Sequence, residues 1–499
     1  MNTSSLRAAL ADAAIAERPT TPVYSPLRAL GRRRLTPFDL LAQSLSTMAP
    51  ATCMVFIAQW MATSGTGFVG VLAIVAATVV MTLVAVCIRQ FTVRLAASGS
   101  LYSFVAHGLG RRATLTTAAA LLVGYLGVSI SVLSNAGENL VRIADLGGAD
   151  VGSGAGTLAC VAIAVVVALI AIRGVRFATR TILVIEICTL TLIVGLLLFS
   201  PTSSVSSDAT LSIPIGFTLF IVMQTVLSLA GFESAAFFGP EARTPLRTVS
   251  RTVLISPILA GSLYVLAGWA GMTGHANTVL SAYFDGADSG QSMMLVVAVN
   301  VGVCSSWIAS TLGFAQAGSR LLFSMSIERI IPGALRHVHQ RFRTPYVAVA
   351  LFVVASVTGS VVHDPDRDGR SYDVVVEIAL ILAYTMVSVA ALRFLDRIGE
   401  HTIWTRVSGI LVAGTGTVLL IIVVIDTASA DSWRYLLWFA VIGCSGSVWY
   451  AALARWRPAS LRSIGVFDSV ETADLLPGSA DLVTDIDGRP ILSAPHRGS

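Results

Sequence analysis

Long apolar stretches alternate with short polar loops along most of the chain. A transmembrane helix needs about 20 predominantly apolar residues to cross the roughly 30 Å hydrocarbon core of a bilayer. When the sequence is divided at its charged and turn-rich segments, twelve apolar windows of comparable length remain. They cover residues 37–64, 68–88, 113–140, 157–172, 181–200, 212–238, 252–274, 292–326, 344–362, 374–392, 407–425 and 435–454. The pattern therefore predicts an all-α integral membrane protein with 12 transmembrane helices.

Basic residues are concentrated in every second loop between these windows. The sequence contains no lysine, so all 33 basic residues are arginines. The arginine-rich segments hold Arg28, Arg32, Arg33 and Arg34, then Arg89, Arg94, Arg111 and Arg112, then Arg173, Arg176 and Arg180, then Arg243, Arg247 and Arg251, then Arg329, Arg336, Arg341 and Arg343, and last Arg393, Arg397 and Arg406. By the positive-inside rule, we expect a multi-pass protein of the plasma (cell inner) membrane with both termini cytoplasmic. The net charge of +5 then follows from topology, and no nucleic-acid partner is expected.

Composition narrows the class of protein further. Hydrophobic residues make up 55% of the chain and charged residues only 12%, against about 25% charged residues in a typical soluble domain. The six cysteines lie within apolar windows and show no CxxC spacing, so we expect no disulfide, no metal and no other cofactor. The histidines fall in loops, and the sequence offers no arrangement of nucleophile and base, so an enzyme is not expected. The segments 1–34 and 457–499 are predicted to be cytoplasmic tails.

Two of the predicted spans contain residues that interrupt a helix. Pro50 lies near the middle of the first window, where it removes a backbone N–H, and Gly231 and Glu233 lie in the sixth. Interrupted helices five spans apart predict two five-helix halves of inverted orientation, residues 35–200 and 201–400, followed by two helices in 401–456. Such a pair indicates the central site of a secondary transporter. The exposed N–H and C=O groups of the two breaks suit a small zwitterion or amine.

Several motifs resemble those of one known group of membrane proteins. The segment AGFESAAFFGPEARTPLRTVSRTV, which begins at Ala230, is similar to the sixth helix and following loop of the amino acid, polyamine and organocation transporter superfamily. The stretch AASGSLYSFVAHGLGRR (96–112) resembles the loop before the third helix of that superfamily. GSRLLFSMSIERIIPGALRHVHQRFRTPYVAV (318–349) resembles its eighth helix and the loop into the ninth. With AYTMVSVAALRF in the tenth window, the resemblance spans about residues 37–400 in the expected order.

The resemblance implies a LeuT-type fold of 5+5 inverted helices plus two C-terminal helices, with alternating access to a site between helices one, three, six and eight. The substrate-binding residues that it implies are Thr47, Met48, Ala49, Pro50 and Ala51 on helix one, Leu227, Ala230, Gly231, Phe232 and Glu233 on helix six, Phe314 on helix eight and Tyr125 on helix three. Ordinary core packing is the alternative for both aromatic residues. Glu233 is expected either to act as a ligand and hinge at the break or to serve as a purely structural cap.

Two departures from the common pattern of the superfamily limit these expectations. The first helix carries MAPA where many members carry a glycine-rich break, so the Pro50 ring removes one donor from a carboxylate site. The absence of lysine excludes the lysine on helix five through which some relatives couple to protons. Glu186 in the fifth window is then the candidate proton carrier, and its alternative role is a carboxyl that stays protonated and hydrogen-bonded to a neighbouring helix.

The prediction for function is a secondary active transporter that carries an amino acid or related small amine, with proton-coupled symport favoured over substrate exchange. A nontransporting membrane sensor with the same fold is the remaining alternative. A channel is not favoured, because the windows offer isolated acids rather than rings of like charge. Near the cytoplasmic end of helix eight, Arg320 is in a position to pair with Glu241. The expected partners are the small-molecule substrate, the lipid bilayer and protons.

Overall fold

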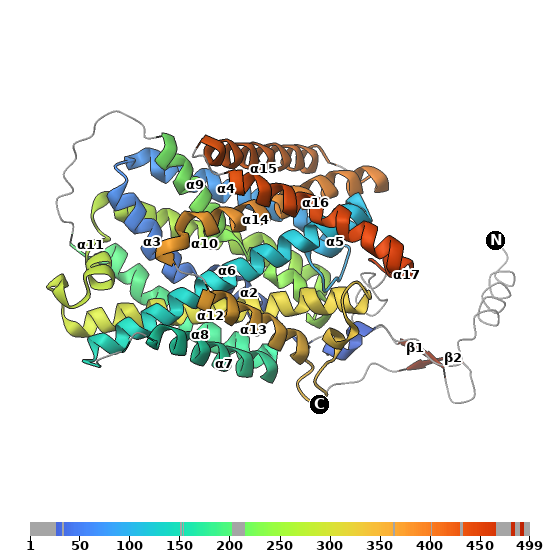
Figure 1. Ribbon diagram of the computed structural model, residues 1–499, viewed down its shortest axis with the longest axis horizontal. Helices are drawn as coiled ribbons and strands as arrows, with labels where there is room; N and C mark the ends of the chain where they lie inside the picture. Colours follow the sequence, from blue (N-terminus) through green and yellow to red (C-terminus); the bar gives the residue numbers. More distant parts are fainter. Residues whose placement is uncertain are drawn as a thin grey trace.

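The computed structural model describes residues 26–31, 34–149, 152, 154–201, 215–362, 365–400, 402–429, 433–465, 481–484 and 490–493. Its dominant feature is a bundle of long helices that run roughly side by side (Figure 1). Eleven helical segments among the described residues are long and apolar enough to cross a membrane. The protein is therefore built as a multi-pass helical membrane bundle, as the hydropathy pattern predicts.

The helices are named here in the order in which they follow one another along the chain. The first part of the chain contains η1 (Pro26–Leu30), α2 (Pro37–Met48), α3 (Pro50–Thr63), α4 (Gly67–Thr92), α5 (Leu101–Leu109), α6 (Arg111–Leu146), α7 (Ala155–Arg173), α8 (Val175–Phe199) and α9 (Ile215–Leu229). The second part contains η2 (Phe232–Glu241), α10 (Pro245–Thr273), α11 (Asn277–Leu280), η3 (Ser281–Asp285), η4 (Gly286–Ser289), α12 (Met293–Ile327), η5 (Gly333–Arg336), α13 (Tyr346–Val362), α14 (Pro365–Ile398), α15 (Ile403–Ser429), α16 (Trp433–Trp456) and α17 (Pro458–Arg462). Near the C-terminus, β1 (Asp481–Thr484) pairs antiparallel with β2 (Pro490–Ser493).

Eleven of the twelve predicted windows coincide with the candidate spans. The window 344–362 forms α13, an apolar helix of 17 residues that is shorter than the other spans. At about 1.5 Å per residue it is roughly 26 Å long, slightly less than the hydrocarbon thickness. Residues 212–214 of the sixth window and most of the predicted tail 1–34 lie outside the described residues. Hydropathy did not predict α5, a short helix between the second and third spans.

The first span is interrupted one residue before Pro50. A capping box between Thr36 and Asp39 starts α2, which ends at Met48. Ala49 then adopts a left-handed conformation, with φ 45° and ψ 56°, and Pro50 is the first residue of α3. Proline is favoured at the first position of a helix, where its missing N–H would have no partner. Pro50 therefore begins the second half of the span instead of kinking a continuous helix.

The sixth span is interrupted at Gly231. Helix α9 ends at Leu229, and the chain continues beyond the break as the 3₁₀ helix η2, which contains Pro240. Gly231 has φ 96°, and a Cβ atom added there would lie 2.5 Å from Cγ2 of Thr47. Glycine is required for both reasons, because the left-handed conformation disfavours a side chain and the first span approaches too closely. The predicted pair of breaks is present, and the two breaks are in contact.

Burial distinguishes the centre of the bundle from its periphery. In the spans Pro37–Thr63 and Tyr372–Ile398, 78% of the most apolar stretch is buried inside the protein, against 25% for α8 and 17% for Leu437–Trp456. Figure 1 shows α15 and α16 along one edge of the bundle and α7 and α8 along the opposite edge. The peripheral helices present apolar side chains outward, as lipid contact requires. The interrupted first span lies in the protein interior, where its exposed backbone groups can find partners.

Candidate functional site

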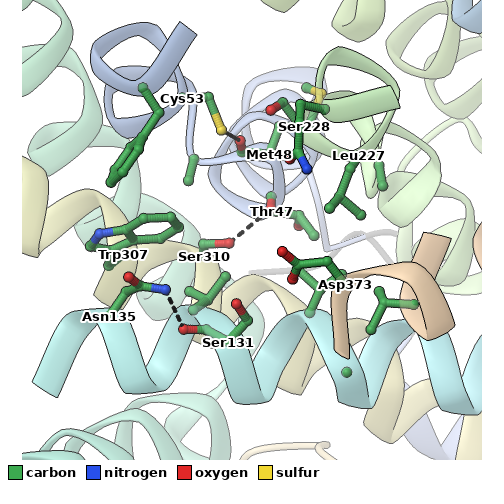
Figure 2. Close-up of a pocket in the computed structure, with 18 of the residues that line it drawn as sticks. Thr47, Met48, Cys53, Ser131, Asn135, Leu227, Ser228, Trp307, Ser310 and Asp373 are labelled. Carbon is green, nitrogen blue, oxygen red and sulfur yellow. Dashed lines mark hydrogen bonds between the residues drawn. The ribbon is translucent and has the colours of Figure 1, made fainter. Parts of the chain in front are cut away.

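A cavity of about 240 Å³ lies where the two interrupted spans meet (Figure 2). Pockets for drug-sized ligands measure about 300–1,000 Å³, so this cavity suits a small metabolite. Its lining residues come from the α2–α3 break, from α3 itself, and from α6, the end of α9, α12 and α14. They are Thr47, Met48, Ala49, Cys53, Phe56, Trp60, Gly127, Val128, Ser131, Val132, Asn135, Gln224, Leu227, Ser228, Ala230, Trp307, Ser310, Tyr372, Asp373 and Val376.

Hydrogen bonds already engage the backbone carbonyl groups of the first break. Ser310 on α12 donates its hydroxyl to the Thr47 carbonyl at 2.8 Å. The Tyr264 hydroxyl on α10 lies 3.2 Å from the Met48 carbonyl and 3.0 Å from the Ser228 carbonyl. Tyr264 thus connects the last residue of α2 to the last turn of α9. A buried break needs such partners, because lipid supplies none for free carbonyl groups.

Side-chain hydrogen bonds also join the two breaks directly. The Thr47 hydroxyl donates to the Ser234 hydroxyl at 3.1 Å. The Ser44 hydroxyl donates to the Phe232 carbonyl at 2.8 Å and accepts the Ala235 N–H at 3.3 Å. These contacts connect α2 with the first turn of η2. A displacement of one interrupted span would therefore carry the other with it or break these bonds.

Glu233 is fully buried behind the cavity and does not line it. Its carboxylate accepts hydrogen bonds from the Tyr125 hydroxyl of α6 and from the Tyr384 hydroxyl of α14, the latter at 3.1 Å. It also accepts the N–H of Gly231 at 3.2 Å. Three distant parts of the chain therefore meet at one carboxylate. The side chain thus satisfies the backbone N–H of Gly231, the residue that immediately precedes η2.

The structure divides the predicted substrate-binding residues into two groups. Five of them line the cavity: Thr47, Met48, Ala49, Leu227 and Ala230. The others are not part of the lining: Pro50, Ala51, Gly231, Phe232, Glu233, Phe314 and Tyr125. Of these, Phe314 and Tyr125 are buried and pack against each other edge to face, with ring centroids 5.4 Å apart. The second group contains residues of the breaks themselves, such as Pro50 and Gly231, and buried residues around them, such as Tyr125 and Phe314.

Several lining residues were missed by the sequence interpretation. Asp373 is the most informative of them, because it is the one ionisable acid or base in the lining apart from the Cys53 thiol and the Tyr372 phenol. It follows the first residue of the candidate span Tyr372–Ile398. The predicted tenth window began at residue 374, so the acid fell one residue outside it. An acid at the edge of an apolar window was the available signal. Asn135, Trp307 and Ser131 carried no motif, and only the fold brings them to the cavity.

Glu186, the predicted proton carrier, lies on α8 with 3% of its surface exposed. It accepts a hydrogen bond from the Ser306 hydroxyl of α12 at 2.9 Å. No described residue hydrogen-bonds to its second carboxyl oxygen, Oε2. The side chain does not line the cavity. It occupies the contact between α8 and α12, and the latter helix contributes Ser310 and Trp307 to the cavity.

An ion pair joins α12 to η2 beyond the cavity, on the side of the arginine-rich loops. Arg320 and Glu241 approach to 2.8 Å and are 1% and 5% exposed, so the pairing suggested by the sequence is present. The Arg320 guanidinium also lies 3.9 Å from the centre of the Phe238 ring. The Glu241 carbonyl accepts the N–H groups of Arg34 and Leu35 at 2.8 and 3.0 Å. Helix α12, η2 and the chain before α2 are thus held together at this end.

Comparisons with known proteins agree on the class of molecule. A family model described as amino acid permease matches residues 35–453. The branched-chain amino acid permease BcaP of Bacillus subtilis is 23% identical over 438 residues, which cover 82% of this chain and 91% of the relative. The methylthioribose transporter of the same organism is 25% identical over 390 residues, 72% of this chain and 80% of the relative. Among solved structures, a mutant of the Eremococcus coleocola manganese transporter has a TM-score of 0.51 at 14% identity, covering 85% of this chain and 95% of that chain. This last likeness concerns the fold alone.

Proposed function

Because the chain belongs to the amino acid permease family, we propose that it carries an amino acid or related small amine across the plasma membrane by alternating access. Family membership makes it a membrane transporter and not an enzyme. The observation that supports the proposed mechanism best is the cavity at the contact between the two interrupted spans. Discontinuous helices that meet at mid-span are the usual binding site of secondary transporters.

The proposed binding site consists of the cavity and the layer behind it. Thr47, Met48, Ala49, Leu227 and Ala230 contact the substrate directly. The second layer contains Pro50, Ala51, Gly231, Phe232, Glu233, Phe314 and Tyr125, which hold the breaks in place. In this arrangement, Glu233 acts as a hinge whose tyrosine partners on α6 and α14 transmit movement of the sixth span. The geometry favours this positioning role over direct contact between Glu233 and the substrate.

The proposed architecture is a LeuT-type pair of inverted repeats. Residues 35–200 form the first repeat, 201–400 the second and 401–456 the two appended helices, with cytoplasmic tails at 1–34 and 457–499. The position of the breaks in the first and sixth apolar helices supports this division. The arginine-rich loops support cytoplasmic termini. Fluorescent-protein fusions at each terminus test the orientation, because the reporter fluoresces in the cytoplasm; a dark but exported fusion would contradict it.

We propose proton-coupled symport, with Glu186 as the group that gains and loses the proton. Its burial between α8 and α12 next to the cavity-lining helix supports this role. Exchange is the second candidate, because the serine/threonine exchanger SteT of Bacillus subtilis is 21% identical over 179 residues, which cover 34% of this chain and 41% of that relative. Uptake into proteoliposomes with an inward proton gradient, or with unlabelled substrate inside, separates the two. The absence of flux under both conditions would favour a nontransporting sensor.

The role of Glu233 is tested by Glu233→Gln. The amide keeps the shape of the side chain but cannot accept hydrogen bonds at both of its positions, so the contacts to Tyr125, Tyr384 and Gly231 cannot all persist. We expect transport to fall while the amount of protein in the membrane is unchanged. Glu400→Gln is the matched control, because Glu400 is exposed and pairs with Arg94 outside the cavity. Normal uptake by Glu233→Gln would remove this carboxylate from the mechanism.

A further inference from the structure

A groove of about 380 Å³ lies between the beginnings of α2 and α10, two helices that pack against each other. Its lining residues belong to the first turns of these helices and the residue before α10: Pro37, Phe38, Leu41, Thr244, Arg247, Thr248, Arg251, Thr252 and Ile255. The groove shares no lining residue with the central cavity. Both helices begin at arginine-rich segments, so the positive-inside rule places the groove at the cytoplasmic boundary of the membrane.

Two arginines give the groove a positive charge. Arg247 and Arg251 are both exposed, and they are four residues apart on α10. Side chains at this spacing lie on the same face of a helix, so the two guanidinium groups are neighbours. Neither forms an ion pair with an acid in the part of the chain that the structure describes. Guanidinium groups bind phosphate through paired hydrogen bonds, so the two arginines suit a phosphate-bearing anion.

The start of α10 adds further donors to the same groove. Thr244 is the N-cap residue of this helix, and its side chain makes no capping hydrogen bond. Its hydroxyl lies 2.6 Å from the hydroxyl of Thr248, and one of the two donates to the other. The pair therefore keeps one hydroxyl proton for a ligand. A helix N-terminus carries a partial positive charge, which favours an anion at this position.

Apolar side chains line the same groove and face outward. Phe38 is 73% exposed and Ile255 is 49% exposed. Ile255 lies about 15 Å along α10 from Pro245, at 1.5 Å per residue, which places it within the hydrocarbon region. Exposed apolar groups at this depth contact acyl chains. A soluble anion would use only the arginines and hydroxyl groups, whereas a phospholipid would contact the whole lining.

We propose that the groove between α2 and α10 binds an anionic phospholipid of the cytoplasmic leaflet. Arg247 and Arg251 hold its phosphate, and Phe38 and Ile255 contact its acyl chains. Basic pockets between transmembrane helices on this side of a membrane bind anionic headgroups in the same way. The lipid bridges α10 to α2, the first half of the interrupted first span, and stabilises their contact. This inference goes beyond the proposed transport function and does not depend on it.

Native mass spectrometry of the full-length protein in detergent micelles tests the site, because a neutral micelle has no charged bilayer surface. The probes are phosphatidylglycerol and phosphatidylcholine with identical acyl chains. We expect the wild type to retain phosphatidylglycerol in preference to phosphatidylcholine. Each arginine near an anionic lipid contributes about 5-fold in affinity, so Arg247→Gln with Arg251→Gln should weaken phosphatidylglycerol binding about 30-fold.

The matched control is Arg455→Gln with Arg457→Gln, which removes two exposed arginines at the end of α16 and should leave the binding unchanged. Arg247→Lys with Arg251→Lys keeps both charges and should retain most of the affinity. Phosphatidylglycerol should also raise the melting temperature of the wild type more than that of the Arg247→Gln, Arg251→Gln variant, because a ligand stabilises the state that binds it.

Four results would overturn the proposal. The first is equal binding of the two lipids by the wild type, or binding of neither, which would leave the groove to another occupant. The second is an unchanged preference in the Arg247→Gln, Arg251→Gln variant. The third is an equal loss of binding in the lysine variant. The fourth is displacement of phosphatidylglycerol by an equal concentration of glycerol phosphate, which would identify a site for a soluble anion. No transport substrate is present, so a failure of the transport function would not alter these results.

Discussion

The close contact of the two breaks makes Gly231→Ala a sharp test of the architecture. The added methyl group would lie 2.5 Å from Cγ2 and 3.1 Å from Cβ of Thr47, and the residue would have to keep a φ of 96°. The left-handed conformation costs a residue with a side chain about 1–2 kcal/mol. Overpacking of a tight interior site costs typically about 1–3 kcal/mol. The substitution should therefore lower the free energy of unfolding by roughly 2–5 kcal/mol.

The two contributions can be separated with Thr47→Ser. This change deletes Cγ2 and keeps the hydroxyl that bonds to the Gln43 carbonyl at 2.7 Å and to the Ser234 hydroxyl at 3.1 Å. Alone it should cost about 0.8 kcal/mol for one lost methyl group. When it is combined with Gly231→Ala, it should recover the loss of unfolding free energy that comes from the steric overlap, about 1–3 kcal/mol. The loss that comes from the left-handed backbone conformation should remain.

The assay is denaturant unfolding of the four proteins in mixed micelles, with uptake measured in parallel. We expect a coupling free energy of about 1–3 kcal/mol between the two sites, with the double variant more stable than Gly231→Ala alone. Additive effects would refute the contact between the breaks. A neutral Gly231→Ala would refute the left-handed conformation at the break of the sixth span.

Two further predictions concern buried charges away from the cavity. Arg320→Leu should lower the free energy of unfolding by about 3–5 kcal/mol, because it leaves the Glu241 carboxylate buried without the cation that it contacts. Adding Glu241→Leu should restore most of the melting temperature. Equal melting temperatures for the single and the double variant would argue against the pair. Glu186→Gln should abolish uptake driven by a proton gradient and preserve exchange with internal substrate. The amide can keep the hydrogen bond with Ser306, but it cannot gain and release a proton as a carboxyl group does. Gradient-driven uptake by this variant would exclude Glu186 as the proton carrier.

The sequence predicted the spans and the breaks because both depend on local chemistry. Hydropathy reflects exclusion from water, whether a helix faces lipid or the protein interior, so eleven windows match candidate spans. Pro50 and Gly231 have backbone properties that act at their own positions. The prediction placed the first break at Pro50, while the structure places the left-handed residue at Ala49, because proline fits the first turn of the new helix.

The partners within the site could not be predicted in the same way. Tyr125 and Tyr384 lie 108 and 151 residues from Glu233 along the chain, and only tertiary packing brings their hydroxyl groups to its carboxylate. Asp373 was overlooked because a hydropathy boundary excludes an acid at the end of an apolar run. Hydropathy could not indicate α5 either, since this short helix lies outside the predicted spans.

The most direct test of the central claim is to fill the cavity and measure transport. Ser228 lines the cavity beside Met48 (Figure 2), and Ser228→Phe would place a ring in the space proposed for the substrate. Val165→Phe adds a ring at a position on α7 that is 53% exposed, and serves as the control. Uptake of radiolabelled amino acids and amines into proteoliposomes should fall to background for Ser228→Phe and stay at the wild-type level for Val165→Phe. Wild-type uptake by a correctly folded Ser228→Phe would show that the substrate does not pass through this cavity.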